Sequence, residues 1–129
     1  MTSAAADILL VAVNARYSHC AYAARSLLAN LGGLAASARI LETDLDITPL
    51  QLAAQIVESR PRVVGFSVYL WSVRLIEATA RILRTVAPHL RLAAGGPELT
   101  ADYANAALFD TVITGEGETA FRAFCERTL

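Results

Sequence analysis

The feature that most constrains the fold is an alternation between short runs of valine, isoleucine and leucine and longer segments whose apolar residues recur at helical spacing. Short, continuously apolar runs are typical of parallel strands that are covered on both faces. Intervening segments of helical period are typical of the helices that connect such strands. The sequence therefore predicts an α/β domain made of consecutive strand–helix units.

Five such units account for the chain. The predicted strands are Asp7–Val13, Ala38–Thr43, Arg62–Ser67, Leu90–Ala94 and Asp110–Thr114. The predicted helices are Ser18–Leu31, a helix that begins at Thr48, and Ser72–Ala87, Glu98–Ala107 and Glu116–Arg127. Thr48-Pro49-Leu50-Gln51 marks the second helix start with an N-cap, a proline at the first helical position and a capping-box glutamine. Five right-handed units of this size fit a flavodoxin-like, doubly wound, three-layer fold with strand order 2-1-3-4-5.

Composition disfavours several partners and compartments. The chain has 129 residues and a net charge of −1, and its 11 basic side chains are arginines spread along the sequence, so no positive patch for nucleic acid or an anionic membrane is apparent. Its apolar runs are far shorter than the about 20 residues of a membrane-spanning helix, and Met1–Ala6 lacks the basic residue of a secretory signal. Cys20 and Cys125 lack the spacing of a zinc or iron–sulfur motif. We expect one cytoplasmic domain without nucleic-acid or membrane partners.

The unusual residues of the chain gather in the loops that follow the predicted strands. Ligands of open parallel sheets bind at the carboxyl ends of the strands, so these loops are the candidate site. They are Asn14-Ala15-Arg16-Tyr17-Ser18-His19, Ser67-Val68-Tyr69-Leu70-Trp71, Gly95-Gly96-Pro97-Glu98 and Thr114-Gly115-Glu116-Gly117-Glu118.

Three common occupants of this fold are disfavoured by these loops. A phosphoacceptor domain needs an aspartate where Ser67 stands and a lysine after the fifth strand, but the sequence has no lysine. The loop after the first strand has one serine and no glycine, which suits neither a flavin phosphate nor a dinucleotide. A larger, mostly neutral ligand remains. The Gly95-Gly96 pair would let a bulky group approach the backbone, and Ser67 would offer a hydroxyl to a long tail.

These loops resemble those of cobalamin-binding domains, in which an SxL-type element follows the third strand and a glycine pair follows the fourth. Here those elements read Ser67-Val68-Tyr69 and Gly95-Gly96. More closely, four segments are similar to the N-terminal domain of cobalamin-binding radical S-adenosylmethionine proteins: Asn14-Ala15-Arg16-Tyr17-Ser18-His19, Val64-Gly65-Phe66-Ser67, Gly95-Gly96-Pro97-Glu98 and Gly115-Glu116-Gly117-Glu118. The resemblance extends over the whole chain.

The resemblance implies a cofactor but no metal ligand from this chain. The family's DxHxxG loop reads Asn14, Arg16 and His19 here, so the histidine that ligates cobalt is absent, and His19 is interpreted as a bystander. The candidate cofactor-binding residues are Asn14, Arg16, Tyr17, Ser67, Tyr69, Trp71, Gly95, Gly96, Gly115 and Glu116. Catalytic residues are not expected, because these loops contain no nucleophile with an adjacent base and no pair of carboxylates at catalytic spacing.

The residues themselves leave several roles open. Tyr69 and Trp71 either stack on a flat ligand or cover the core. Glu116 either binds a cofactor hydroxyl or, like Glu118, is stabilised by the positive end of a helix dipole and needs no ligand. Gly95-Gly96 either lines a channel or makes a turn into a helix.

Two functions follow. The first is a cobalamin module whose parent continues into a C-terminal radical S-adenosylmethionine domain, with a CxxxCxxC loop that holds a [4Fe–4S] cluster, in a methyltransferase or an oxidative cyclase. On this interpretation the chain is a domain of a longer protein and is not an enzyme by itself. The second is a degenerate domain that serves as an interaction platform or substrate lid. Channel-filling side chains of Tyr69, Leu70 and Trp71 would favour the second.

Overall fold

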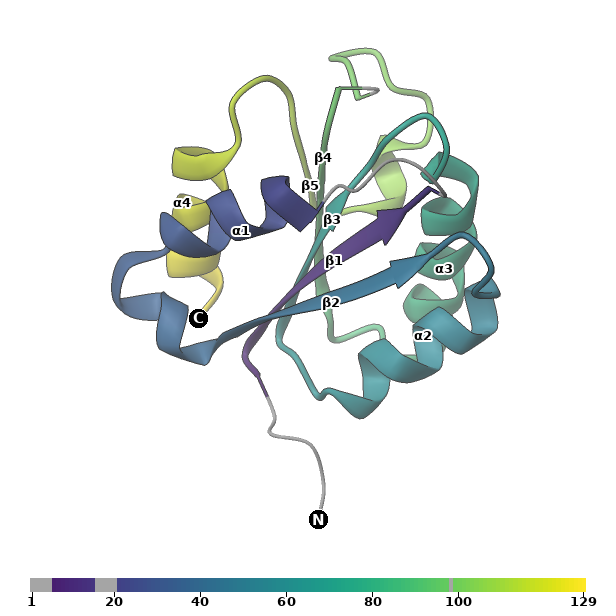
Figure 1. Ribbon diagram of the computed structural model, residues 1–129, viewed down its shortest axis with the longest axis horizontal. Helices are drawn as coiled ribbons and strands as arrows, with labels where there is room; N and C mark the ends of the chain where they lie inside the picture. Colours follow the sequence, from purple (N-terminus) through teal and green to yellow (C-terminus); the bar gives the residue numbers. More distant parts are fainter. Residues whose placement is uncertain (1–5, 16–20, 98) are drawn as a thin grey trace.

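The computed structural model describes residues 6–15, 21–97 and 99–129. Its centre is a five-stranded sheet in the order β2-β1-β3-β4-β5, in which every neighbouring pair is parallel (Figure 1). The strands are β1 (Ile8–Asn14), β2 (Ala38–Asp44), β3 (Val63–Ser67), β4 (Arg91–Gly95) and β5 (Thr111–Ile113). The predicted α/β class, strand order and flavodoxin-like, doubly wound arrangement are therefore confirmed.

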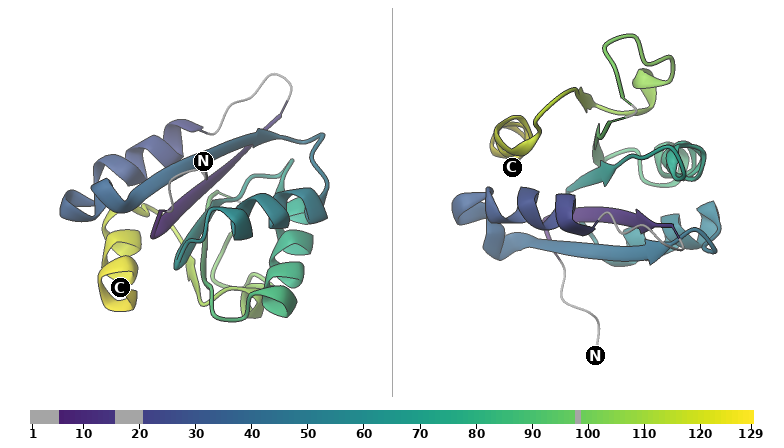
Figure 2. Two further views of the ribbon diagram at one scale, coloured as in Figure 1. Left: turned by 90° about the horizontal axis from the view of Figure 1, so that it is seen from below. Right: turned by 45° about the horizontal axis from the view of Figure 1, so that its top comes forward.

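Helices cover both faces of this sheet. They are α1 (Ala21–Ala29), α2 (Pro49–Glu58), α3 (Val73–Val86) and α4 (Glu118–Thr128), with 3-10 helices η1 (Gly32–Ser37) and η2 (Ala106–Leu108). Figures 1 and 2 show α1 and α4 together on one side of the sheet and α2 and α3 together on the other. Within the described residues, no helix is long and apolar enough to cross a bilayer.

The alternation of side chains in the central strands produces two separate cores. In β1, Leu9, Val11 and Val13 pack into a cluster with buried residues of α2 and α3. Ile8, Leu10 and Ala12 pack into the other cluster, which includes residues of α1 and α4. All seven residues of β1 are buried, as expected for a central parallel strand that is covered on both sides.

The start of α2 is stabilised as its sequence predicts. The backbone N–H of Gln51 donates to the Thr48 hydroxyl at 3.1 Å, and the backbone N–H of Thr48 donates to the Gln51 side-chain carbonyl at 3.0 Å. This reciprocal pair is the capping box, and Pro49 occupies the first turn.

Three predicted helices differ from the structure, and one of them, predicted as Glu116–Arg127, is α4 and begins two residues later, at Glu118. α1 ends at Ala29 rather than Leu31 and is followed by η1, while the predicted start at Ser18 lies outside the described residues. The predicted helix Glu98–Ala107 is wrong over its described part: residues 99–105 are turns and irregular backbone, and only the short η2 follows.

Side-chain hydrogen bonds explain why the connection between β4 and β5 is not an α-helix. The Glu77 carboxylate of α3 accepts hydrogen bonds from the Tyr103 hydroxyl and, at 2.8 Å, from the Asn105 amide. The Arg84 guanidinium donates to the Leu108 carbonyl at 2.8 Å. These groups hold the segment against α3 in an irregular path, which a helical pattern in the sequence does not reveal.

Candidate cofactor-binding site

The carboxyl edge of the sheet brings together the ends of β1, β3 and β4. Asn14, Ser67 and Gly95 are the last residues of these strands, and Ser67 is paired in register with Gly95. Gly115 follows β5 by two residues at the same edge. The sequence-based expectation that these four residues share one edge is confirmed by the parallel topology.

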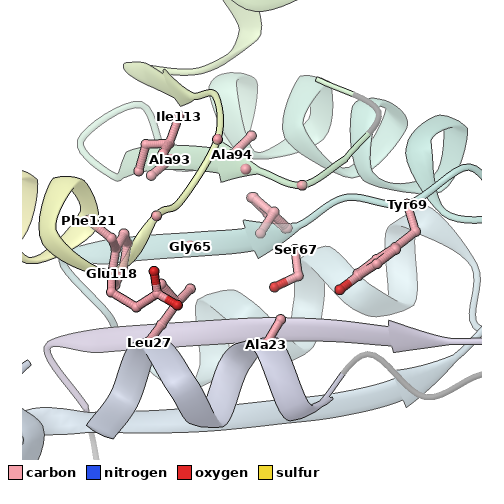
Figure 3. A pocket seen from close by; sticks show the side chains of 15 residues that line it. Ala23, Leu27, Gly65, Ser67, Tyr69, Ala93, Ala94, Ile113, Glu118 and Phe121 are labelled. Atoms are coloured by element: carbon pink, nitrogen blue, oxygen red, sulfur yellow. The ribbon is translucent and has the colours of Figure 1, made fainter. Parts of the chain in front are cut away.

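A cavity of about 150 Å³ lies beside this edge, between β3, β4 and β5 and the helices α1 and α4 (Figure 3). Most of the side chains that line it are small or apolar. The lining residues are Ala23, Leu27, Gly65, Phe66, Ser67, Tyr69, Ala93, Ala94, Gly95, Gly96, Ile113, Gly115, Gly117, Glu118 and Phe121. A cavity of this size and character accommodates about one aromatic ring.

Small residues in the strands create the space. A Cβ atom at Gly65, in the middle of β3, would lie 2.8 Å from the ring of Phe121. The missing side chain therefore lets Phe121 of α4 pack directly onto the sheet, where the ring contributes to the cavity wall. Ala93 and Gly95, on the neighbouring strand β4, also line the cavity and have small or no side chains.

The two glycines after β4 have different functions in the structure. A Cβ at Gly95 would be 3.5 Å from its nearest neighbour, the Ile113 carbonyl oxygen, so that position has room for a side chain. Gly96 has a φ of +141°, and a Cβ there would lie 2.0 Å from the Val68 carbonyl oxygen. Gly96 is therefore required by the close approach of the loops after β3 and β4 as well as by its backbone conformation.

The polar side chains of the cavity wall are Ser67, Tyr69 and Glu118. Ser67 is buried, with 7% of its surface exposed. Figure 3 shows the Ser67 and Tyr69 hydroxyls directed into the space between β3 and α1. The Glu118 carboxylate lies on the α4 side and accepts a hydrogen bond from the Ser26 hydroxyl of α1 at 3.1 Å. An apolar cavity with a few polar groups is typical of small-molecule sites.

Tyr69 and Trp71 are stacked on each other in the loop after β3, with ring centroids 4.8 Å apart. The Trp71 indole N–H donates to the Val13 carbonyl at 3.0 Å, so the indole is fixed against the end of β1. Only Tyr69 of the pair lines the cavity, and Leu70 between them is 73% exposed. Trp71 and Leu70 therefore leave the cavity open.

Several predicted site residues lie away from the cavity wall. The Asn14 amide donates to the Glu42 carboxylate at 2.6 Å, beside a separate polar groove that includes Asp44 and Asp46. Glu116 is exposed and does not line the cavity. Arg16, Tyr17 and His19 lie outside the described residues.

Sequence reasoning missed the wall that the helices contribute. Ala23 and Leu27 of α1, Ile113 of β5 and Phe121 of α4 all line the cavity. Their apolar character identifies them as core residues, and no local pattern shows that a cavity interrupts that core. The sequence alone attributes Glu118 to the helix dipole, although its place in the Gly115–Glu118 motif is a usable signal.

The fold and the cavity define a doubly wound α/β domain with an apolar pocket at the carboxyl edge of its sheet. The chain belongs to the B12-binding domain family, whose model matches residues 8–125. No curated protein matches the sequence.

Among solved structures, the chain is similar to a novel cobalamin-binding protein from Desulfitobacterium hafniense DCB-2, with a TM-score of 0.71 and 16% sequence identity. The match covers 96% of this chain and 59% of that protein, so the chain spans less than two thirds of its length. At this identity the similarity shows a common fold.

The chemical character of the cavity lining fits the base at the end of a cobalamin tail. That tail ends in a benzimidazole, an apolar bicyclic ring with one exposed ring nitrogen. The cavity offers apolar walls from Leu27, Ile113 and Phe121 and one buried hydroxyl from Ser67. Gly95 also lines the cavity, and the absence of a side chain there leaves room beside the end of β4.

Proposed function

We propose that this chain binds cobalamin with its nucleotide tail in the cavity between the sheet and the helices α1 and α4. Ser67 and Tyr69 would offer hydroxyls to the tail, and Gly95 and Gly115 would give it room beside the backbone. The observation that carries the proposal is an open apolar cavity at the carboxyl edge of a B12-binding domain.

The arrangement of the aromatic residues supports this proposal over an interaction platform. A platform without a cofactor would be favoured if Tyr69, Leu70 and Trp71 filled the channel. Instead Leu70 is exposed, and Trp71 packs against Tyr69 and the Val13 carbonyl. The side chains of Leu70 and Trp71 thus leave room for a ligand.

We further propose that cobalt receives no ligand from this chain. Asn14 stands where the family's loop has aspartate, and its amide already donates to Glu42. Arg16 stands at the position of the ligating histidine. We therefore expect a base-off cobalamin spectrum, and we expect His19→Ala to retain it. Loss of cobalamin binding in His19→Ala would refute this part of the proposal.

The parent protein that we propose contains a C-terminal radical S-adenosylmethionine domain with a CxxxCxxC loop, a [4Fe–4S] cluster and S-adenosylmethionine. Bound cobalamin would supply a methyl carrier or a radical partner to a methyltransferase or an oxidative cyclase. The Gly95–Glu98 and Gly115–Glu118 motifs support this context. Reading the coding sequence downstream of Leu129 tests it, and a stop codon directly after Leu129 would refute it.

The cavity is tested by adding a side chain at Gly95. Gly95→Val places methyl groups in the cavity, whereas Gly33→Val adds the same groups where nothing lies within 4 Å of the new Cβ. Titration with cobalamin, followed by its visible spectrum, should show at least about tenfold weaker binding for Gly95→Val and no change for Gly33→Val. Cobinamide, which lacks the nucleotide tail, should bind both variants and the unmodified chain equally weakly.

The proposal fails if the unmodified chain binds cobalamin no better than cobinamide. It also fails if Gly95→Val leaves the preference for cobalamin intact.

A further inference from the structure

We infer that the Glu118 carboxylate is a ligand-binding group of the cavity, which accepts a hydrogen bond from a donor on the nucleotide tail. The inference rests on the proposed binding of cobalamin and adds a contact that the family assignment does not supply. Glu118 is partly buried, lies in the first turn of α4 and lines the cavity.

The helix dipole explains why an acidic residue is favourable at position 118, but it does not explain the direction of the Glu118 side chain. A carboxylate in the first turn of α4 interacts favourably with the dipole even when it points into water. Glu118 instead turns toward α1, where the Ser26 hydroxyl donates to its Oε1 atom at 3.1 Å. Ser26 thus holds the carboxylate at the cavity wall.

Glu116 provides an internal comparison within the same motif. It lies two residues earlier, is exposed and does not line the cavity. The two glutamates therefore have similar local sequence but different surroundings. Only the direction of Glu118 places an anionic acceptor beside the apolar space.

An anionic acceptor at an apolar wall selects for a ligand that carries a donor. A carboxylate has about four lone-pair sites and no hydrogen to donate, and Ser26 occupies one of these sites. Glu118 also lines an outer groove with Asn30 and Arg122, so a ligand that fills the cavity displaces water only from those remaining sites that face the cavity. The resulting loss of hydration is unfavourable unless the ligand donates a hydrogen bond in return.

The nucleotide tail of a cobamide can supply such a donor from two places. Ribose hydroxyls are present in every cobamide that carries a nucleotide, and an adenine base adds an exocyclic amino group. Both are neutral donors to a carboxylate oxygen. Cobinamide has neither group, so it measures binding of the corrin alone.

The experiment compares three variants of the full chain with three ligands: cobalamin, the adeninyl cobamide and cobinamide. Glu118→Leu removes the acceptor, Glu118→Gln keeps a neutral acceptor of the same size, and Glu116→Gln is the matched control. We expect Glu118→Leu to weaken cobalamin binding about tenfold and Glu118→Gln to weaken it less. Cobinamide affinity should not change in any variant, and Glu116→Gln should bind all three ligands normally.

The ligands also identify the donor. An equal loss for both cobamides in Glu118→Leu assigns the contact to the ribose, and a loss for both that is larger for the adeninyl cobamide adds a contact to its amino group. If Glu118→Leu lowers the melting temperature, the isosteric Glu118→Gln decides the result.

Two outcomes separate this inference from the proposal on which it rests. Equal binding of cobalamin and cobinamide by the unmodified chain overturns the proposed function. A clear preference for cobalamin that survives in both Glu118 variants overturns the role of Glu118 and leaves the proposed function in place.

Discussion

The rings of Tyr69 and Trp71 lie nearly parallel, 7° apart, with their centroids separated by 4.8 Å. Because the Trp71 indole also donates to the Val13 carbonyl, the pair connects the end of β1 to the loop after β3. Tyr69 forms part of the cavity wall and Trp71 does not. Trp71 therefore influences the cavity through the position of Tyr69.

Replacing Trp71 by phenylalanine should keep a ring beside Tyr69 and remove the hydrogen bond to Val13. We expect the free energy of unfolding to fall by about 1 kcal/mol, the typical contribution of one such bond. Urea denaturation followed by far-ultraviolet circular dichroism measures this change. Tyr22→Phe, at a side chain that is 80% exposed, should be neutral. A Trp71→Phe variant as stable as the original chain would contradict the prediction.

Alanine at Gly96 should destabilise the fold far more than alanine at Gly95. At Gly96 the new Cβ would meet the Val68 carbonyl oxygen at 2.0 Å, and the φ of +141° is unfavourable for any residue with a side chain. We expect a loss of more than about 2 kcal/mol for Gly96→Ala. Thermal denaturation of both variants tests this difference, and equal melting temperatures would refute it.

The Gly96 prediction also changes how a binding defect should be interpreted. From the sequence, the Gly95-Gly96 pair is expected to let a bulky ligand approach the backbone, so a side chain at Gly96 would be expected to obstruct that ligand. In the structure the added atom collides with the protein's own backbone, so lost binding in this variant would reflect a distorted loop.

The Cys125 thiol should be unreactive in the folded protein. Cys125 is fully buried, and burial, assisted by the negative charge of Glu126, raises the pKa of its thiol to about 12. In a Cys20→Ser background, we expect a thiol reagent at pH 8 to react only after denaturation. Rapid reaction of the native protein would contradict this burial.

The same thiol makes stability depend on alkaline pH. Its pKa is higher in the folded state than the usual 9, so the stabilisation is complete below about pH 9 and is lost as the pH rises toward 12. Comparing Cys125→Ala with the original side chain across this range, again in the Cys20→Ser background, isolates the contribution. A constant difference in unfolding free energy between the two proteins would argue against it.

The ion pairs of Asp110 should contribute a salt-dependent part of the stability. Asp110 lies 3.0 Å from Arg84 and 3.5 Å from Arg91, and it also accepts a hydrogen bond from the Leu92 N–H. Asp110→Asn can keep the last contact but loses the charge. We expect a loss of about 1 kcal/mol at low ionic strength, because the Arg84 pair is only partly exposed.

Added salt should reduce the loss of stability in Asp110→Asn, because screening weakens partly exposed ion pairs. The Arg122–Glu126 pair is more exposed than the pair of Arg84 and Asp110. Glu126→Gln should therefore leave the free energy of unfolding unchanged at all salt concentrations. An Asp110→Asn effect that is independent of salt would contradict an ionic origin.

The sequence predicts the sheet well because its signals are local. The apolar run at Ile8–Val13 defines the central strand, and the Thr48–Gln51 capping box marks the start of α2. The path between β4 and β5 depends instead on Glu77, Tyr103 and Asn105. The partners in these bonds are more than 20 residues apart, so local periodicity could not reveal them.

In the candidate site, too, the residues with a local sequence signal could be predicted and those placed by packing could not. Ser67 and Gly95 were predicted because they directly follow strands that end at one edge. Phe121 and Glu118 were missed because their helix faces the cavity only after α4 packs onto Gly65 and α1. The gap left by a glycine is a property of two elements together, and neither segment encodes it alone.

The cavity wall has a thermodynamic consequence, because it includes Ala23 of the first helix and Phe121 of the last. A molecule held between them acts as a removable crosslink between distant parts of the sequence. Any ligand that binds only the folded chain adds about 2.7 kcal/mol to the free energy of unfolding at 100 times its dissociation constant. Under such conditions, a bound cofactor would stabilise the packing of α1 and α4 against the sheet, and its loss would lower the free energy of unfolding.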